Sequence, residues 1–527
     1  MNRRLARALA AGLALLLAAT ALTSCTDDGP DVTLRVLAAP ELADVDGLLD
    51  DLEKDTGVEL DMVYEATAGL DGLTGRRTGR DAYDLAWLTS DRSLRLRLQD
   101  TGTPPPESTA IMRSPVVAGL TPEVARTLRA ASPGGRISWA DIADAAADGT
   151  LRFGMADPRR SDTGRAALVG VATAAAGTGS ALREEDVSCD RLRGFRSGQT
   201  LTAASSRDLI ATYARRPRAA DALIAHEAEL LSLNATGKLP RPLDIVHPDD
   251  GMVLSDFPLL LLDPARRSAY QRVTKWLLGA EAQRRLMERT HRRPVNQDVE
   301  PSPALKAPVG NALSFPDRLS LVERLVDDYG DPVRHSAGQV VFVLDYSTSM
   351  RGARIAGLRA AFAGLSGADD TPSGKFARFY RGERLTVVRF GGHVLEERTV
   401  TVRGEADLRR LRRTVAEGDF AGATAIWTAL DHGYRIAAKA VREHPGRPVS
   451  IVLMTDGENN AGLGYDAFLR RHRALGADAR AVPTFPVLFG EADAAALRRV
   501  AAATGGRMVD AGLSSLSDAF KEIRGCH

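Results

Sequence analysis

Three short stretches near the C-terminus carry carboxylate and hydroxyl side chains. Asp345, Ser347 and Ser349 follow one unbroken apolar run, Asp456 follows another, and Thr424 lies between them. Apolar runs that end abruptly in polar residues are typical of strands buried on both faces of a parallel sheet, and the loops beyond the carboxyl ends of such strands form the ligand crevice. Oxygen ligands without Cys or His suit a hard cation such as Mg²⁺. The five side chains therefore predict a site for a divalent cation.

The elements that must position these residues alternate between strand and helix. Helical spacing connects Ile355, Leu358, Phe362 and Leu365, strands are expected over residues 385–390, 394–402 and 485–489, and a long helix is expected over residues 425–441. A further helix ends at Gly505-Gly506, which is a helix-ending signal. This alternation predicts a doubly wound α/β domain with a mostly parallel sheet covered on both faces.

The order Asp-x-Ser-x-Ser, then Thr, then Asp resembles the metal-ion-dependent adhesion site of von Willebrand factor A domains. The resemblance covers about residues 337–525 and implies a Rossmann-like fold in which Ser347, Ser349 and Thr424 contact Mg²⁺ or another hard divalent cation. It implies that both Asp side chains act partly through water and that a partner protein's carboxylate takes the open position. Ala423 stands where the family often has Gly, which removes no ligand. The alternative is a structural domain of the same fold that binds no metal.

The N-terminus has the pattern of an export signal. Arg3, Arg4 and Arg7 precede an apolar stretch over residues 9–22 that is too short to span a bilayer comfortably. The four residues that end at Cys25 resemble the bacterial lipobox, which implies a signal peptide over the first 24 residues and lipid chains on Cys25. An ordinary signal peptide that happens to contain a Cys is the alternative.

The expected location is the outer face of the cell membrane, where the lipid on Cys25 and a short tether over residues 25–30 would hold the chain. Removal of residues 1–24 takes away three Arg, so 69 basic residues become 66 against 68 acidic ones. This near-neutral balance gives no reason to expect nucleic acid as a partner.

Two further cysteines, Cys189 and Cys526, remain after Cys25. An exported protein meets an oxidising compartment, where such a pair can form a disulfide that would tie the C-terminal tail to the N-terminal half. Two unpaired thiols are the alternative. Metal binding by this pair is not expected, because the chain has no matching CxxC or Cys/His cluster.

Residues 31–300 have an alternating pattern of their own, with strands expected over 33–37, 60–64 and 84–88 and a helix over 45–52. Several stretches resemble extracellular solute-binding proteins of type-two periplasmic-binding topology. They are residues 112–117, 137–142, 153–158, 161–164, 247–251, 256–259 and 292–295. The resemblance implies two lobes that close over a small-molecule solute by a hinge motion. A Pro-rich connector with a helix, over residues 301–336, is expected to join this domain to the C-terminal one.

The solute cleft is expected at the strand ends of the N-terminal domain. The candidate ligand-binding residues are Glu65, Thr67, Thr89, Ser90, Ser114, Ser161, Thr163 and Glu227. Ser161 and Thr163 precede an apolar helical run, so their hydroxyls and the free backbone N–H groups suit an anion. Plain helix capping is the alternative for these two residues.

No catalytic motif is present: the sequence has no phosphate loop, no G-x-S-x-G and no HExxH. We therefore expect a binding protein and no enzyme. Three hypotheses follow. The first is metal-dependent adhesion to an acidic group of a protein partner. The second is solute capture for an importer or sensor with the C-terminal domain as accessory. The third is a cell-wall hydrolase, which has no residue set behind it.

Overall fold

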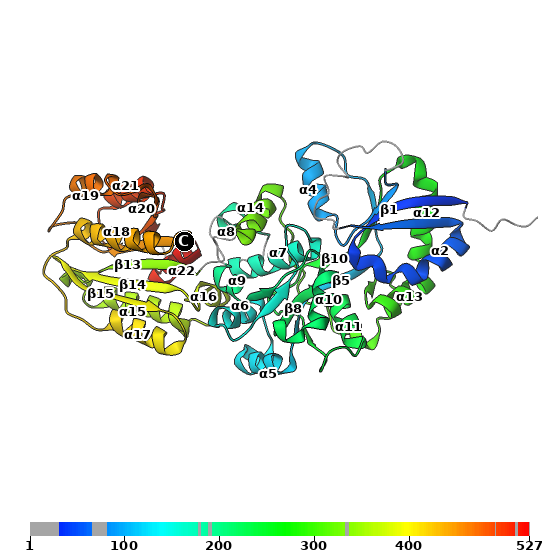
Figure 1. Ribbon diagram of the computed structural model, residues 1–527, viewed down its shortest axis with the longest axis horizontal. Helices are drawn as coiled ribbons and strands as arrows, with labels where there is room; N and C mark the ends of the chain where they lie inside the picture. Colours follow the sequence, from blue (N-terminus) through cyan, green and yellow to red (C-terminus); the bar gives the residue numbers. More distant parts are fainter. Residues whose placement is uncertain are drawn as a thin grey trace, which may run out of the picture.

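The computed structural model describes residues 31–65, 82–177, 181–187, 192–331, 337–490, 492–511 and 515–525. These residues form three sheets, each with its own helices, along one long axis (Figure 1). We refer to the three bodies, in the order of their first strands, as lobe 1, lobe 2 and the C-terminal domain. The predicted α/β class and the two-lobed N-terminal architecture are confirmed.

Lobe 1 is a five-stranded sheet of order β2-β1-β3-β11-β4. Its elements are β1 (Val32–Ala38), α2 (Leu49–Thr56), β2 (Val58–Tyr64), β3 (Leu85–Trp87), α4 (Arg92–Asp100), β4 (Glu107–Ala110), β11 (Pro258–Leu261), α12 (Arg267–Leu277) and α13 (Ala280–Thr290). Strand β11 returns from far along the chain and pairs antiparallel with β3 and β4. The helix expected over residues 45–52 begins only at Leu49, because short 3₁₀ turns that include Pro40 and Gly47, both poor helix formers, precede it.

Lobe 2 is a sheet of order β10-β5-β8-β6-β7, with β9 and β12 also paired to β5. Its strands are β5 (Met112–Leu120), β6 (Phe153–Met155), β7 (Gln199–Leu201), β8 (Ala222–His226), β9 (Asp244–Val246), β10 (Leu254–Ser255) and β12 (Arg293–Pro294). Its helices are α5 (Pro122–Ala131), α6 (Trp139–Asp148), α7 (Asp162–Ala176), α8 (Glu184–Val187), α9 (Arg193–Ser197), α10 (Ser206–Arg215) and α11 (Glu227–Ala235). The connector helix α14 (Leu319–Gly330), expected from the sequence, packs on α7, α8 and α4.

The C-terminal domain is a six-stranded sheet of order β15-β14-β13-β16-β17-β18, parallel except for β15. Its strands are β13 (Gln339–Asp345), β14 (Arg384–Phe390), β15 (Val394–Thr401), β16 (Val449–Thr455), β17 (Thr484–Leu488) and β18 (Val509–Asp510). Its helices are α15 (Ala353–Ala363), α16 (Pro372–Ala377), α17 (Glu405–Ala416), α18 (Ile426–Glu443), α19 (Tyr465–Arg473), α20 (Ala477–Arg480), α21 (Ala494–Thr504) and α22 (Leu516–Gly525).

Helices cover both faces of this sheet, with α18, α19 and α21 on one side and α15 and α17 on the other (Figure 1). Strand β13 explains the unbroken apolar run of the sequence, because its successive side chains enter two separate cores and all are buried. The doubly wound arrangement predicted from the sequence is therefore present.

The C-terminal domain is docked on lobe 2 through the short helix α16. Phe376 packs into the core of lobe 2, and two cations on or beside α16, Lys375 and Arg378, form ion pairs with Asp141 and Asp144 of helix α6. The N–H of Arg381 donates to the carbonyl of Ala147 at 2.8 Å. Helix α16 therefore ties the C-terminal domain directly to lobe 2.

Candidate functional site

The five predicted metal ligands meet at the carboxyl end of the C-terminal sheet. Asp345 is the last residue of β13, and Asp456 follows the neighbouring strand β16. Ser347 and Ser349 lie in the turn after β13. The loop that carries Thr424 is held at this turn by Ala421, three residues before it, whose backbone N–H donates to the carbonyl of Tyr346 and whose carbonyl accepts from the N–H of Thr348. Two neighbouring strand ends and one loop thus assemble the site.

Hydrogen bonds connect four of the five side chains. The Asp345 carboxylate accepts from the N–H of Ser347 and from the hydroxyl of Thr455, both at 2.7 Å. The hydroxyls of Ser347 and Ser349 lie 2.9 Å apart, and Ser349 Oγ donates to Asp456 Oδ1 at 2.9 Å. The network therefore runs from Asp345 to the backbone of Ser347, and from the Ser347 side chain through the hydroxyl of Ser349 to Asp456.

Thr424 joins the site through a second loop. Its N–H donates to the side-chain oxygen of Asn460 at 2.8 Å, and its carbonyl accepts from the N–H of Asn460 at 3.0 Å. A methyl group on Gly457 would lie 3.8 Å from the Thr424 hydroxyl oxygen, so the loop after Asp456 is in contact with Thr424. Asn460 was not singled out in the sequence, although the polar run after β16 is a signal that could have identified it.

Both acids of the site are buried, whereas Ser349 is exposed. Burial raises the pKa of Asp345, and the nearby charge of Asp456 adds to this effect against the hydrogen bonds from Thr455 and Ser347. Two carboxylates at close quarters destabilise each other unless a positive charge lies between or beside them. The site thus favours a cation, and Ser349 gives it an opening to solvent.

The donor set fits a hard divalent cation. Carboxylate and hydroxyl oxygens are the ligands of Mg²⁺. Among the described residues, no group of three or more His, Cys, Asp and Glu side chains could hold a metal ion, so this candidate site depends on its hydroxyls as well as on its two acids. Arg354, which the sequence analysis did not single out, donates from its guanidinium to the second oxygen of Asp456. One of the two acids therefore already has a cationic partner.

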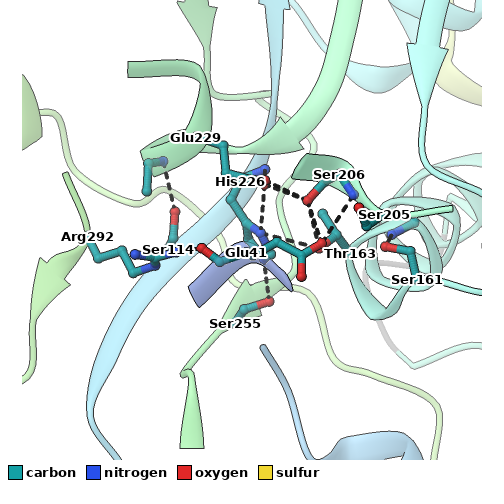
Figure 2. Close-up of polar contacts among 12 residues, drawn as sticks. Glu41, Ser114, Ser161, Thr163, Ser205, Ser206, His226, Glu229, Ser255 and Arg292 are labelled. Carbon is teal, nitrogen blue, oxygen red and sulfur yellow. Dashed lines mark hydrogen bonds and ion pairs between the residues drawn. The ribbon is translucent and has the colours of Figure 1, made fainter. Parts of the chain in front are cut away.

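A second polar cluster lies between the lobes (Figure 2). Glu41 of lobe 1 reaches the start of helix α10 in lobe 2, where its carboxylate accepts from the N–H of Ser206 at 3.1 Å and from the Ser206 hydroxyl at 2.9 Å. The same hydroxyl lies 2.7 Å from a carboxylate oxygen of Glu229. Arg292 donates to the carbonyl of Glu41 at 2.8 Å. Lobe 1 thus contributes an acid to a helix N-terminus of lobe 2, a place that favours anions.

The two acids of this cluster share one hydroxyl hydrogen. Burial, followed by the charge of Glu229, raises the pKa of Glu41. Burial also acts to raise the pKa of Glu229, but hydrogen bonding and charge from His226 outweigh it and the pKa is lowered. The pKa values of the two acids therefore shift in opposite directions, so Glu41 takes up a proton more readily than Glu229.

Several predicted cleft residues lie in or beside this cluster. Ser161 caps helix α7, because its hydroxyl accepts from the N–H of Gly164 at 3.2 Å. Thr163 Oγ1 lies 3.4 Å from His226 Nδ1, and Ser114 Oγ accepts from the N–H of Ala228 at 3.1 Å. Ser161 and Thr163 are therefore brought together at this cluster, while Ser114 holds helix α11 in place. Their role as solute ligands stays a prediction.

The other predicted cleft residues have different surroundings. Glu227 is bound by Arg293 and by His247 and so is already neutralised. Thr89 is buried, with no partner for its hydroxyl in the described part of the chain, and Ser90 accepts from the N–H of Arg92 at 3.3 Å. Glu65 is exposed. Thr67 and the three cysteines, Cys25, Cys189 and Cys526, lie outside the described residues.

The acids and the His that fill the cluster were not predicted from the sequence. Glu41, Ser206, His226 and Glu229 were not among the candidates. The sequence carries a signal for two of these positions: Ser205-Ser206-Arg-Asp208 has the pattern of a helix cap, and Ser205 does accept from the N–H of Asp208 at 3.1 Å. His226 is the last residue of a buried strand, β8. Nothing local in the sequence indicates that Glu41 would cross from lobe 1 to lobe 2.

The folds define a chain of two α/β parts, a two-lobed N-terminal one and a doubly wound C-terminal one. Residues 34–289 match the family model of bacterial extracellular solute-binding proteins, and residues 339–522 match that of the von Willebrand factor type A domain. The chain therefore carries an extracellular solute-binding domain followed by a von Willebrand factor A domain, which we call the A domain. No curated protein matches the chain.

Solved structures that resemble the N-terminal region are periplasmic binding proteins. The protein AfuA from Actinobacillus pleuropneumoniae, with fructose-6-phosphate bound, is 14% identical with a TM-score of 0.45, and the match covers 57% of this chain and 98% of that one. Iron-bound HitA from Pseudomonas aeruginosa is 16% identical with a TM-score of 0.45, covering 57% of this chain and 100% of that one. At such identities the likeness concerns fold alone.

An extracellular solute-binding domain implies an exported protein. Among the described residues, we find no helix with the length and apolar character required to cross a bilayer.

Proposed function

We propose that this protein is a lipid-anchored, exported binding protein whose A domain uses a hard divalent cation, with Mg²⁺ as the first candidate, to hold a carboxylate of a partner protein. The observation that carries the proposal is the convergence of two buried acids and three hydroxyls at one edge of the sheet that is open at Ser349. A binding role also agrees with the two domain families.

The hydroxyls and the acids of the site would have different roles toward the cation. Ser347, Ser349 and Thr424 would offer hydroxyl oxygens to the ion, and the two acids would balance its charge. When bound, the cation supplies a positive centre that can accept an outside acidic oxygen. Thr455 orients Asp345 through its hydroxyl at 2.7 Å, so the acid is held in place before any ion arrives.

The position of this edge favours contact with an outside partner. The contacts that hold the A domain on lobe 2 involve helix α16 and the segment before β14, which lie at the amino ends of the strands. For example, Tyr380 in that segment accepts from the N–H of Gly338, which directly precedes β13. The metal edge is at the opposite, carboxyl ends and is left free by these contacts.

The experiment is calorimetric titration of the mature protein with Mg²⁺, Mn²⁺ and Ca²⁺, followed by a crosslinking pull-down from cell surfaces with and without EDTA. We expect Asp345→Ala to weaken metal binding by at least about a hundredfold and to abolish capture, because it removes an acid held at the centre of the network. Asp478→Ala, an exposed acid on α20, is the matched control. Absence of metal binding in the wild type would refute the proposal, as would capture that is indifferent to EDTA.

Solute capture by the N-terminal domain is the second candidate function. The observation in its favour is that the N-terminus of α10 already accepts a carboxylate, that of Glu41. We propose that a solute with an anionic group would take this place by displacing Glu41. A thermal-shift screen of the mature protein and Glu41→Ala against carboxylates, oxyanions and sugar phosphates tests this, because a ligand that binds the folded state raises its stability by mass action. A flat response in both proteins would contradict it.

A further inference from the structure

Arg354, on the first turn of helix α15, is a sixth residue of the metal edge. Its guanidinium donates to Asp456 Oδ2, while Ser349 Oγ donates to Asp456 Oδ1 at 2.9 Å, so both oxygens of this acid are engaged. The Asp456 side chain is 0% exposed and that of Arg354 is 35% exposed. The pair therefore joins a buried acid to a cation that can reach solvent.

Gly490, just after β17, forms the other wall of the space that the guanidinium occupies. Its backbone is left-handed, with φ of 69°, and a Cβ at this position would lie 3.1 Å from Arg354 Cζ and 3.2 Å from the carbonyl oxygen of Asp456. Any larger residue would press on both groups. The chain thus has a fitted place for the guanidinium beside the acid.

A buried carboxylate is costly unless a cation or several hydrogen bonds compensate for the lost water. Arg354 supplies that cation for Asp456. A divalent ion at this edge would compensate the same negative charge. Two cations at one carboxylate repel each other, so each weakens the binding of the other.

We propose that Arg354 is an internal counter-ion that a divalent cation must displace from Asp456, and that this exchange sets the affinity of the site for metal. The inference rests on the proposed metal site. The site then loads only when enough metal is present to compete with the guanidinium. Because Arg354 is already partly exposed, the displaced side chain can move toward solvent without unfolding helix α15.

The test is calorimetric titration of the mature protein with Mn²⁺ at constant pH, comparing wild type with Arg354→Gln and Arg354→Lys. We expect Arg354→Gln to bind Mn²⁺ about tenfold more tightly, in the usual range of coupling between two interacting sites. Arg354→Lys should fall between the two, because it keeps the charge but lacks the planar fork. The matched control is Arg359→Gln, on the same helix but bonded to the carbonyl of Ala416.

Thermal unfolding in EDTA and in Mn²⁺ gives a second measurement. In EDTA, Arg354→Gln should unfold at a lower temperature than wild type, because Asp456 has lost its cation, and Mn²⁺ should remove this difference. An affinity that is unchanged or weaker in Arg354→Gln, with wild type still binding Mn²⁺, overturns this inference alone. Failure of every variant to bind Mn²⁺ overturns the metal site and the inference with it.

Discussion

The interlobe cluster and the metal edge use similar groups to different ends. Each places two carboxyl groups among Ser and Thr hydroxyls beyond the ends of strands. In the cluster, Glu41 is buried, Glu229 is nearly so, and the two share the hydroxyl of Ser206 across the interface between the lobes. At the metal edge, all contacts come from one domain, and Ser349 is exposed.

The difference lies in what compensates each pair of acids. Lobe 1 supplies its own carboxyl group to lobe 2, so the cluster is completed by the contact between the two lobes. The metal edge has one exposed side and a partly exposed cation, Arg354, so its acids can still accept an ion from solution. We infer that one site stabilises a conformation and that the other is prepared for an outside ligand.

Replacing Lys375 should have the largest effect. It tests whether lobe 2, which carries most of the interlobe cluster, and the C-terminal domain, which carries the metal edge, unfold as one unit. Lys375 is 12% exposed and its partner Asp141 is 8% exposed, and the contact holds the pKa of Asp141 below its ordinary value although burial acts to raise it. Lys375→Ala leaves a buried acid without its cation, which should lower stability by about 2 kcal/mol. We expect urea unfolding, followed by tryptophan fluorescence, to change from one transition to two.

This effect should also depend on pH. A carboxyl group whose pKa is lowered by folding contributes stability above its unfolded pKa and loses it as the pH falls through the folded value. The difference between Lys375→Ala and wild type should therefore be full at pH 7 and shrink below about pH 4. Lys439→Ala, an exposed Lys with 67% of its side chain accessible, is the control. Equal losses of stability in Lys375→Ala and Lys439→Ala would show that the docking contact contributes no more than an exposed ion pair does.

Most of the fold was accessible from the sequence because its signals are local. The apolar run 340–344 predicts a strand buried on both faces, and Gly505 predicts a helix end, which it forms with φ of 75°. The five oxygen-bearing residues at the metal edge could be identified because four of them lie at or just beyond the ends of apolar strands and Thr424 lies just before a long helix, and both kinds of element are marked in the sequence. The structure brings them to one edge, and their metal binding stays a prediction.

The parts that escaped prediction depend on contacts between distant segments. Glu41 and Ser206 are 165 positions apart, and Arg354 and Asp456 are 102 apart. A Glu after a strand or an Arg on a helix carries no mark of such a partner. The same holds for α16, whose six residues give no local sign that Phe376 packs into the core of lobe 2.

Glu41→Gln tests whether the interlobe acid carries the shared proton. Because burial raises the pKa of Glu41, its contribution to stability is full below the unfolded value and declines as the pH rises through the folded value. Gln imitates the protonated acid, so the variant should lose this decline and be more stable than wild type by about 1 kcal/mol at pH 8. At pH 4 the two proteins should agree.

Urea unfolding at several pH values measures this difference, with Glu65→Gln, an exposed acid at the end of β2, as the control. If the free energy of unfolding of Glu41→Gln depends on pH as steeply as that of wild type, Glu41 is not the group that takes up the proton. That outcome would also remove the contrast between a cluster completed from within and an edge prepared for a metal ion.

Ser161→Ala gives the smallest expected effect and decides between two readings of the cleft. Ser161 accepts from the N–H of Gly164 at 3.2 Å, so its loss should cost about 1 kcal/mol as a helix cap. If the hydroxyl only caps α7, any ligand found in the thermal-shift screen should raise the unfolding temperature of the variant as much as that of wild type. Ser205→Ala, which removes the cap of α10 beside Glu41, is the matched comparison. A ligand response lost in Ser161→Ala but kept in Ser205→Ala would instead assign the hydroxyl to solute binding, and the cleft would then resemble the metal edge in being prepared for an outside ligand.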